Sequence, residues 1–308
     1  MIRKRTSYSN LAKYINKNGI DLVYIRNDHN ANPFLIRLFK KLKKSGVKLV
    51  MEIPTYPYDQ EYTGLGFAMQ MQLKVDKFFR NRLARYVDRI ITFSQDQQIF
   101  GTPTINISNG IDFDAIKIKS RTSTDHKVIR MIGVADIHAW HGYDRVIAGL
   151  AEYYKKPHHV KIYFDIVGGG VPGILDGLKD AVVRNSLDEY VTYHGPKFGE
   201  ELDRFFEDAD LAIGSLARHR SNIFNIKTLK NREYAARGIP FVYSETDEDF
   251  ENMPYIMKAP ADESPLDIQS VIDFYQTVDL KPEDIRKSVV HSLSWKKQME
   301  KIIEQINA

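Results

Sequence analysis

The sequence predicts an α/β protein with two Rossmann-like, doubly wound domains. Helix-like and strand-like patterns alternate over residues 5–118, and the alternation restarts after a polar run at 117–127. Strands separated by helices of about ten or more residues imply right-handed crossovers and parallel sheets. A chain of 308 residues is also long enough to bury two separate cores.

The composition is that of an ordinary globular protein, with 43% hydrophobic and 27% charged residues and a mild net charge of +4. The absence of Cys excludes disulfides, Cys-ligated zinc and a thiol nucleophile. No apolar run approaches the roughly 18–20 residues of a membrane span. The N-terminal sequence MIRKRTSYSN lacks the apolar core of a signal peptide. We therefore expect a cytoplasmic protein.

The first domain is expected to span residues 1–118 and to contain three strands. The predicted elements are a helix at 11–18, a strand at 21–25, a helix at 33–44, and strands at 47–53 and 89–93. A doubly wound domain normally begins with a strand and a glycine-rich turn, whereas this chain opens on a helix. We therefore expect the first strand to be missing, with about 60–70 residues fewer than the usual two-domain length.

Residues 74–89 predict a basic amphipathic helix. Its apolar face consists of Val75, Phe78, Phe79, Leu83, Tyr86 and Val87, and its remaining surface carries Lys74, Lys77, Arg80, Arg82, Arg85 and Arg89. We favour a helix that packs on the core and exposes its basic face to solvent. The alternative is peripheral contact with the anionic inner face of a membrane.

The second domain, 119–293, is expected to be a complete parallel α/β unit. Its strands are predicted at 128–134, 160–167, 190–193, 210–216 and 239–244, and its helices at 142–154, 174–185, 200–207, 229–237 and 267–277. The C-terminal segment, 294–308, predicts an amphipathic helix that can pack back on the first domain.

The stretch 215–244 is the first candidate for a binding site. A polar, basic loop at 217–226 precedes a helix for which Thr228 is the expected N-cap and Gly238 the stop signal. The loop and helix start of such a unit open at the carboxyl edge of the sheet, where ligands bind. We expect Glu233, in the middle of the helix, to lie close to that opening.

A glycine motif and several acidic pairs are interpreted as structural. Gly168, Gly170 and Gly173 match the dinucleotide-binding spacing, but Pro172 interrupts it and no acid follows a strand about 20 residues later. We therefore expect a tight strand-to-helix turn. The Asp-x-Asp pairs and the nine His residues do not show metal-ligand spacing, so no metal site is expected.

The loop Gly133–Gly142 (GVADIHAWHG) is a second candidate, because it leads from a strand into a helix. Its backbone N–H groups can meet a phosphate, and His138 and His141 can add partial positive charge. The alternative is that Trp140 and the histidines only pack against and cap the helix.

The loop Glu52–Glu61 (EIPTYPYDQE) begins at the end of a buried strand. Glu52, Tyr56, Tyr58 and Glu61 supply planar faces and hydrogen-bond acceptors that suit a hydroxyl-rich ligand. The alternative is a rigid surface loop fixed by its two prolines.

Together these stretches resemble the family 4 glycosyltransferases over nearly the whole chain. The segments SNGID, DIVGGG, TYHG followed by Pro196 and Lys197, and NREYAARGIPFVYS are similar, in that order, to motifs of the family. EIPTYPYDQE resembles an acceptor-side loop of bacterial members that build capsule and exopolysaccharide. The resemblance implies the GT-B fold, in which two Rossmann-like domains face each other across a cleft, and a retaining transfer.

The resemblance assigns roles to individual residues. It implies that Glu233 holds the nucleotide ribose and that a base-binding loop contains Gly195, Pro196 and Lys197. Asn225 stands where the family has its first glutamate, so it would bind the sugar without charge. The family's diphosphate-binding Arg and Lys have no counterpart after the strand at 128–134. We expect their charge to come from the cations Arg218, Arg220 and Lys227, together with the helix start at Thr228 and Leu229.

The function expected from the resemblance is a hexosyltransferase-type reaction in bacterial surface polysaccharide biosynthesis. A nucleotide-diphosphate sugar would be the substrate, no cofactor would be required, and the acceptor would be a glycan or a lipid-linked glycan. The alternative is a truncated or degenerate protein that binds nucleotide or serves a complex without catalysis. A nucleic acid partner is not expected, since no recognised nucleic-acid-binding module accompanies the basic helix.

Overall fold

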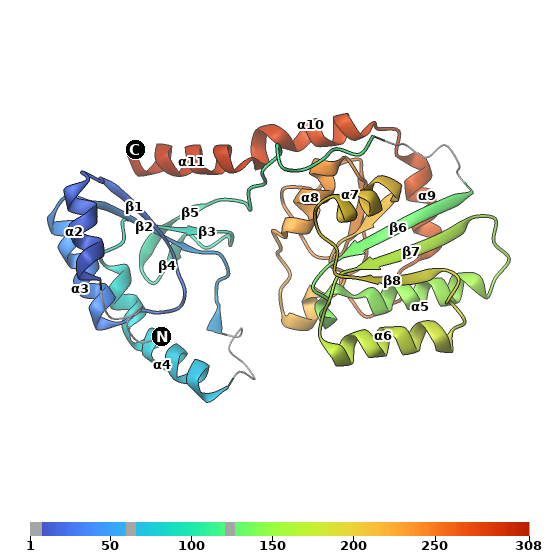
Figure 1. Cartoon of the computed structure of the whole chain (residues 1–308), viewed down its shortest axis with the longest axis horizontal. Helices are drawn as coiled ribbons and strands as arrows, with labels where there is room; N and C mark the ends of the chain where they lie inside the picture. Colours follow the sequence, from blue (N-terminus) through green and yellow to red (C-terminus); the bar gives the residue numbers. More distant parts are fainter. Residues whose placement is uncertain (1–7, 60–65, 121–126, 308) are drawn as a thin grey trace. The chain divides into compact units, whose positions relative to one another are not determined.

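The computed structural model describes residues 8–59, 66–120 and 127–307 and contains two compact units (Figure 1). Unit 1 takes the chain up to Ser108 and again from Gln298, and unit 2 takes Asn109–Lys297. This division falls before the expected boundary at 118/119. The reason is that Ile111 and Phe113 pack in the core of unit 2, so the segment after Ser108 is part of that unit.

Unit 1 has a five-stranded sheet in the order β1-β2-β3-β5-β4, and its pairs are parallel except β4 with β5. The strands are β1 (Leu22–Arg26), β2 (Lys48–Ile53), β3 (Arg89–Thr92), β4 (Gln98–Ile99) and β5 (Thr102–Asn106). The short β4 and β5 were not predicted, because their residues show neither a long apolar run nor a clear alternation.

Two apolar clusters cover the sheet of unit 1. One joins it to α2 (Ser9–Lys17), α3 (Pro33–Lys44) and α4 (Phe67–Ala84). In the other, Ile302 of α11 (Trp295–Asn307) packs with Val50, Ile91 and Ile105 from the strands. The last turns of the chain therefore complete the core of unit 1.

The structure corrects the predicted helix at 74–89. Helix α4 begins at Phe67 and ends at Ala84, and two residues assigned to its core face, Val75 and Phe78, are 43% and 72% exposed. The buried face instead contains Asp76, which accepts hydrogen bonds from the Ala31 N–H (2.8 Å) and the Tyr58 hydroxyl (2.6 Å). These two bonds fix the rotation of the helix, and Phe78 points to solvent as a result.

Unit 2 has a six-stranded, fully parallel sheet in the order β11-β10-β9-β6-β7-β8. Its strands are β6 (Val128–Val134), β7 (Lys161–Val167), β8 (Val191–Gly195), β9 (Leu211–Ile213), β10 (Phe241–Tyr243) and β11 (Ile256–Lys258). The central strands are apolar on both sides, since Met131 joins one cluster and its neighbour Ile132 the other. This pattern is typical of parallel strands covered on both faces.

Helices cover both faces of this sheet (Figure 1). One side has α5 (Tyr143–Tyr154), α6 (Pro172–Arg184) and α9 (Ile268–Thr277), and the other has α7 (Gly199–Asp208), α8 (Leu229–Arg237) and α10 (Pro282–Leu293). Helix α8 has its predicted bounds, and Gly238 ends it in the left-handed conformation with φ of 77°. Strand β11 and helix α10 were not predicted.

The glycines after β7 allow two loops of unit 2 to meet. The Ile137 N–H donates to the Gly169 oxygen at 2.7 Å. A Cβ at Gly168 would lie 1.7 Å from the Ala135 oxygen, and one at Gly170 would lie 2.4 Å from the Ile137 oxygen. These glycines therefore bring the loop after β7 against the loop after β6, as expected of a tight turn.

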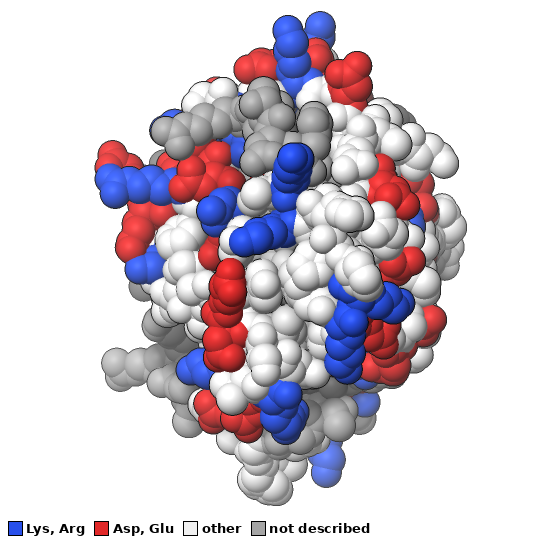
Figure 2. Space-filling model, turned by 90° about the vertical axis from the view of Figure 1, so that its right-hand side faces the viewer, with Lys and Arg blue, Asp and Glu red and all other residues white. Residues whose placement is uncertain are grey.

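Charge is mixed over the face of the molecule drawn in Figure 2, where acidic and basic side chains lie side by side among uncharged residues. Within residues 8–59, 66–120 and 127–307, no helix is both long and apolar enough to span a bilayer. The same residues contain no group of three or more His, Asp or Glu side chains placed to hold a metal ion.

Candidate functional site

The start of α8 is an uncapped helix terminus. Thr228 occupies the N-cap position, but its side chain makes no capping hydrogen bond, and its buried Oγ1 has no partner among the described residues. The first N–H groups of a helix have no partner within the helix, and the helix dipole adds partial positive charge there. An uncapped helix start therefore attracts an anion.

Two basic side chains, Lys230 and Arg218, lie close together beside this helix start. The Lys230 Nζ and the Arg218 Nε are shielded from solvent and have no hydrogen-bond partner in the described part of the chain. The Lys230 Nζ lies 5.6 Å from the centre of the Tyr143 ring, and the Arg218 guanidinium lies 5.3 Å from that of Trp140. Aromatic faces offset part of the cost of a buried charge. They do not supply a hydrogen-bond acceptor for either side chain, so the pair is a candidate anion site.

The electrostatics of the cluster agree with this assignment. Burial, and then the Arg218 charge, lower the pKa of the Lys230 ammonium well below its usual value. Burial also lowers the pKa of Arg218, while Glu245 acts in the opposite direction. In both residues the environment disfavours the charged form, because no anion compensates for the lost water.

His141 does not add the positive charge expected of it. Burial and the nearby charges of Lys230 and Arg218 lower its pKa to about 2, so the imidazole is neutral at pH 7. Its Nδ1 accepts the His138 N–H at 3.0 Å. His138 stacks on Trp140 with ring centres 4.1 Å apart, so both histidines help to order the loop.

The predicted cation set also changes. Arg220 donates to both carboxylate oxygens of Asp144 (3.0 and 2.7 Å) and to Glu263, so its charge is already neutralised. Burial lowers the pKa of Lys227, while Asp249 and Glu248 raise it. The Lys227 charge therefore lies near acidic side chains, and no carboxylate of the described residues forms an ion pair with Arg218.

Sequence reasoning missed Lys230. Its position as the second residue of the helix, two residues after the expected N-cap, was the available signal, because a side chain there can reach an anion at the helix start. A lysine in a first turn is nevertheless common on exposed surfaces. Only the packing of Tyr143 and Arg218 around it shows that its Nζ is enclosed.

Two predicted glycines, Gly133 within β6 and Gly142 directly before α5, allow close packing. A Cβ at Gly133 would lie 2.7 Å from the Tyr143 ring, and one at Gly142 would lie 2.8 Å from the Leu216 Cβ. Gly142 also has a positive φ of 67°. Gly133 therefore leaves room for Tyr143, and Gly142 keeps the loop close to the segment that leads to Arg218.

Glu233 and Asn225 occupy different surroundings. Glu233 is half-buried on α8, where it accepts a hydrogen bond from the Arg237 guanidinium at 3.0 Å. Arg237 is also bonded to Asp203 at 2.7 Å, which orients the Glu233 carboxylate through its helix neighbour. Asn225 is exposed, and its backbone forms an isolated bridge with Thr246. Leu229, the first residue of α8, is 56% exposed.

The expected base-binding residues follow β8. Gly195 has a positive φ of 64°, and its oxygen accepts the Gly168 N–H at 2.8 Å. Pro196 is exposed, and Lys197 forms an ion pair with Glu201. This loop is thus tied to the glycine turn after β7, which in turn contacts the loop after β6.

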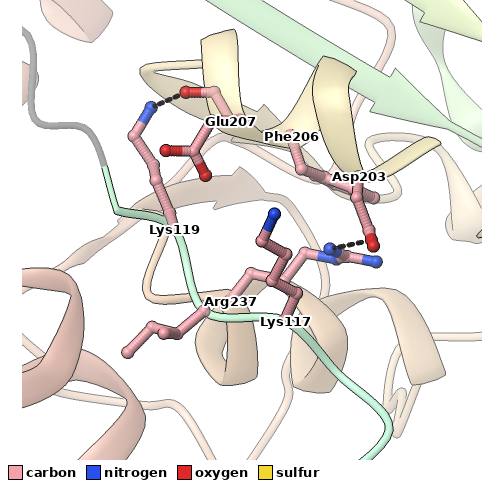
Figure 3. Close-up of a pocket in the computed structure, with 7 residues that line it drawn as sticks. Lys117, Lys119, Asp203, Phe206, Glu207 and Arg237 are labelled. Atoms are coloured by element: carbon pink, nitrogen blue, oxygen red, sulfur yellow. Dashed lines mark hydrogen bonds and ion pairs between the residues drawn. The ribbon is translucent and has the colours of Figure 1, made fainter. Parts of the chain in front are cut away.

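A small pocket elsewhere in unit 2 is not a comparable site (Figure 3). Its lining includes Lys117, Lys119, Asp203, Phe206, Glu207 and Arg237. Arg237 is paired with Asp203, and the Lys119 Nζ donates to the Glu207 main-chain oxygen at 2.9 Å. Arg237 and Lys119 thus have hydrogen-bond partners in this pocket, in contrast to the Lys230 Nζ and the Arg218 Nε, which have none among the described residues.

In unit 1, Glu52 is the last but one residue of β2 and pairs with Arg26 at the end of β1. Its side chain is 5% exposed, and its Oε2 accepts the Tyr24 hydroxyl at 2.5 Å. Its Oε1 has no hydrogen bond within the described residues and lies 3.6 Å from the Arg26 Nε. The Glu52 carboxylate is therefore fixed by Tyr24 at the carboxyl edge of the sheet, and its Oε1 accepts no hydrogen bond from the described residues.

Two of the other predicted acceptor residues, Tyr56 and Tyr58, pack against aromatic neighbours in unit 1. Tyr58 is 1% exposed, its ring stacks on His29 at 3.9 Å, and its hydroxyl is bonded to Asp76, so it has a packing role. Tyr56 packs edge-on against Phe100. Glu61 lies outside the described residues.

Solved structures share the architecture of the whole chain. That of Anabaena Alr3699/HepE in complex with UDP aligns with a TM-score of 0.67 and 17% identity, over 97% of this chain and 81% of that one. The structure of a glycosyltransferase from Rickettsia africae aligns with a TM-score of 0.64 and 13% identity, over 97% of this chain and 79% of that one. That of sucrose-phosphate synthase from Thermosynechococcus elongatus aligns with a TM-score of 0.63 and 14% identity, over 96% of this chain and 76% of that one. The fold is GT-B. No protein-family model and no curated protein sequence matches the chain. In this GT-B chain, unit 2 carries the cation pair and unit 1 carries Glu52.

Proposed function

We propose that this GT-B protein is a glycosyltransferase that takes its sugar from a nucleoside diphosphate sugar. The observation that carries the proposal is the pair of enclosed cations, Lys230 and Arg218, at the uncapped start of α8. A diphosphate supplies the negative charge and the acceptor oxygens that this cluster lacks. Structures of the Anabaena protein contain UDP and UDP-glucose, which supports a uridine nucleotide as the first ligand to test.

The remaining donor contacts are proposed from the resemblance to the family 4 glycosyltransferases. Glu233 would accept hydrogen bonds from the ribose hydroxyls, and Gly195, Pro196 and Lys197 would contact the base. Asn225, being uncharged, would bind a sugar hydroxyl. The cation pair and the helix N–H groups would stabilise the diphosphate as it leaves, the kind of electrostatic stabilisation that contributes most to many enzymes. We propose that this assistance supports transfer with retention of configuration.

The acceptor would be a hydroxyl of a glycan or lipid-linked glycan, as in surface polysaccharide synthesis. The unused Glu52 Oε1 supports an acceptor contact in unit 1, because a buried carboxylate oxygen gains most from a hydroxyl donor.

A second candidate function is donor binding without transfer. Asn225 in place of an acidic residue favours it, since no carboxylate then lies at the expected sugar contact. Incubation of the protein with UDP-glucose separates the two functions. Released UDP, with or without an added acceptor, supports a transferase, and binding without release supports the non-catalytic protein.

The test of the donor site is UDP binding by calorimetry. Lys230→Met and Glu233→Ala should each weaken binding at least about tenfold, because each removes a charged hydrogen-bonding group worth about 1.5–3 kcal/mol. Lys281→Met is the matched control, since Lys281 also stands at a helix start, that of α10, but is exposed. An unchanged affinity in Lys230→Met would overturn the proposed site.

A further inference from the structure

Helix α4 presents a large apolar stripe to solvent. Phe67, Met71, Val75 and Phe78 are 81%, 40%, 43% and 72% exposed. They are spaced by four, four and three residues, which places them on one face of the helix. With 18 residues the helix is about 27 Å long, so the stripe extends over most of its length.

The charges on the same face have one sign. Lys74 and Arg82 are exposed among the apolar residues of the stripe, and Arg85 caps its end. The only acid in the helix sequence is Asp76, which is buried on the opposite face by its bonds to Ala31 and Tyr58. The exposed face of α4 is therefore both apolar and cationic. On the face drawn in Figure 2, by contrast, side chains of both signs lie side by side.

Such a face suits one kind of surface. Large apolar side chains gain free energy by entering the boundary between lipid headgroups and acyl chains, and neighbouring Lys and Arg side chains are attracted to anionic headgroups. A protein partner would need acidic groups matched to Lys74, Arg82 and Arg85, whereas a bilayer adapts to their spacing. A second copy of the chain would bring like charges together on this face, which costs free energy.

We propose that the exposed face of α4 docks unit 1 on an anionic membrane surface. The helix lies in the plane of the interface, with Phe67, Met71, Val75 and Phe78 inserted and the three cations at headgroup level. The basic helix expected from the sequence covered residues 74–89, whereas this surface begins at Phe67. Its apolar stripe contributes to membrane binding as much as its charge does.

The experiment is co-sedimentation of the full chain with vesicles. Vesicles of phosphatidylcholine with about 30% phosphatidylglycerol should bind the protein, and pure phosphatidylcholine vesicles should bind it at least about tenfold less. Phe67→Ser/Phe78→Ser should lower binding to anionic vesicles about tenfold or more. Lys74→Gln/Arg82→Gln should lower it about tenfold and weaken its dependence on salt.

The matched control is Val183→Ser/Ile303→Ser, which removes two apolar residues that are 64% and 50% exposed on α6 and α11. It should bind vesicles like the natural protein. Equal binding by Phe67→Ser/Phe78→Ser would overturn the proposal. The proposal would also be overturned if light scattering showed that the natural protein is a dimer and that Phe67→Ser/Phe78→Ser is a monomer. The stripe would then join two copies of the chain.

A second readout locates the helix in the lipid. Phe78→Trp should show a blue-shifted emission, and quenching by brominated lipid, beyond those of the natural protein on anionic vesicles. No change would contradict insertion. The inference does not depend on the proposed transferase activity, because Phe67→Ser/Phe78→Ser should retain the UDP affinity of the natural protein.

Discussion

At the scale of the residue, Lys230 destabilises the empty protein. Its pKa is lower in the folded chain than in the unfolded one, so the unfolded state binds the proton more tightly. The buried lysine therefore lowers the free energy of unfolding most at pH values below its folded pKa. This destabilisation is lost as the pH rises through the usual lysine pKa of about 10.4.

Lys230→Met should consequently stabilise the protein without ligand. The gain in free energy of unfolding should be larger at pH 7 than at pH 10, as measured by urea unfolding at both values. Met keeps most of the side-chain volume and removes the buried charge, so packing is preserved. If Lys230→Met were less stable than the natural protein at pH 7, Lys230 would not be a destabilising buried charge.

We expect Lys230 to take up a proton when UDP binds. A diphosphate beside Lys230 favours its charged form and raises its pKa, so at a pH above the pKa of the empty site the lysine takes up a proton. Calorimetry of UDP binding at pH 8 in buffers of different ionisation enthalpy measures this proton. The uptake should be lost in Lys230→Met and kept in Lys281→Met.

The residue scale is also where sequence reasoning was least complete. Glu233 and Arg218 could be chosen from their spacing and from the resemblance. Lys230 could not, because its role depends on Tyr143 and Arg218 closing around it. Arg220 was chosen for its charge, and the sequence does not show that Asp144 and Glu263 meet it in space.

At the scale of the element, α8 begins without a side-chain cap, and its start is the proposed phosphate site. Thr228→Asp supplies the missing cap and a carboxylate next to the cation pair. It should raise the stability of the empty protein by about 1 kcal/mol and abolish UDP binding by occupying the site. Thermal melting with and without UDP measures both effects.

Asp267 provides the comparison, because its side chain caps α9 by accepting from the N–H groups of Gln269 and Ser270 (3.0 and 3.2 Å). Asp267→Ala should lower stability by about 1 kcal/mol and leave UDP affinity unchanged. If Thr228→Asp retained UDP binding, the helix start would not be the phosphate site.

Elements with strong local signals were predictable. The bounds of α8 followed from an N-cap position and a C-terminal glycine, and the strands β6 and β7 from long apolar runs. The rotation of α4 was not predictable, because it depends on bonds from Asp76 to Ala31 and Tyr58, distant in the sequence. The short β4, β5 and β11 are defined by pairing rather than by composition.

At the scale of the whole molecule, unit 1 depends on the end of the chain. Ile302 is 2% exposed and packs with Val50, Ile91 and Ile105. Ile302→Ala should cost about 2–5 kcal/mol, the usual range for a buried aliphatic side chain. Hydrogen exchange should show the loss in β2, β3 and β5, with the strands of unit 2 unaffected.

The neighbouring residue is the control for that experiment. Ile303 is 50% exposed, so Ile303→Ala should change stability by no more than about 0.5 kcal/mol. Faster exchange spread equally over β6 and β7 would instead mean that the two units unfold as one.

The chain passes from one unit to the other twice, at Ser108/Asn109 and again at Lys297/Gln298. The two crossings are bonded to each other, since the Ile111 N–H donates to the Leu293 oxygen at 2.8 Å and the Ser108 N–H to the Gln298 side chain at 2.7 Å. A single cut in the backbone therefore cannot release either unit with its core intact. Recombination with a related gene at one crossover point would separate Ile302 from the sheet it covers, and a working hybrid requires both junctions to be exchanged together.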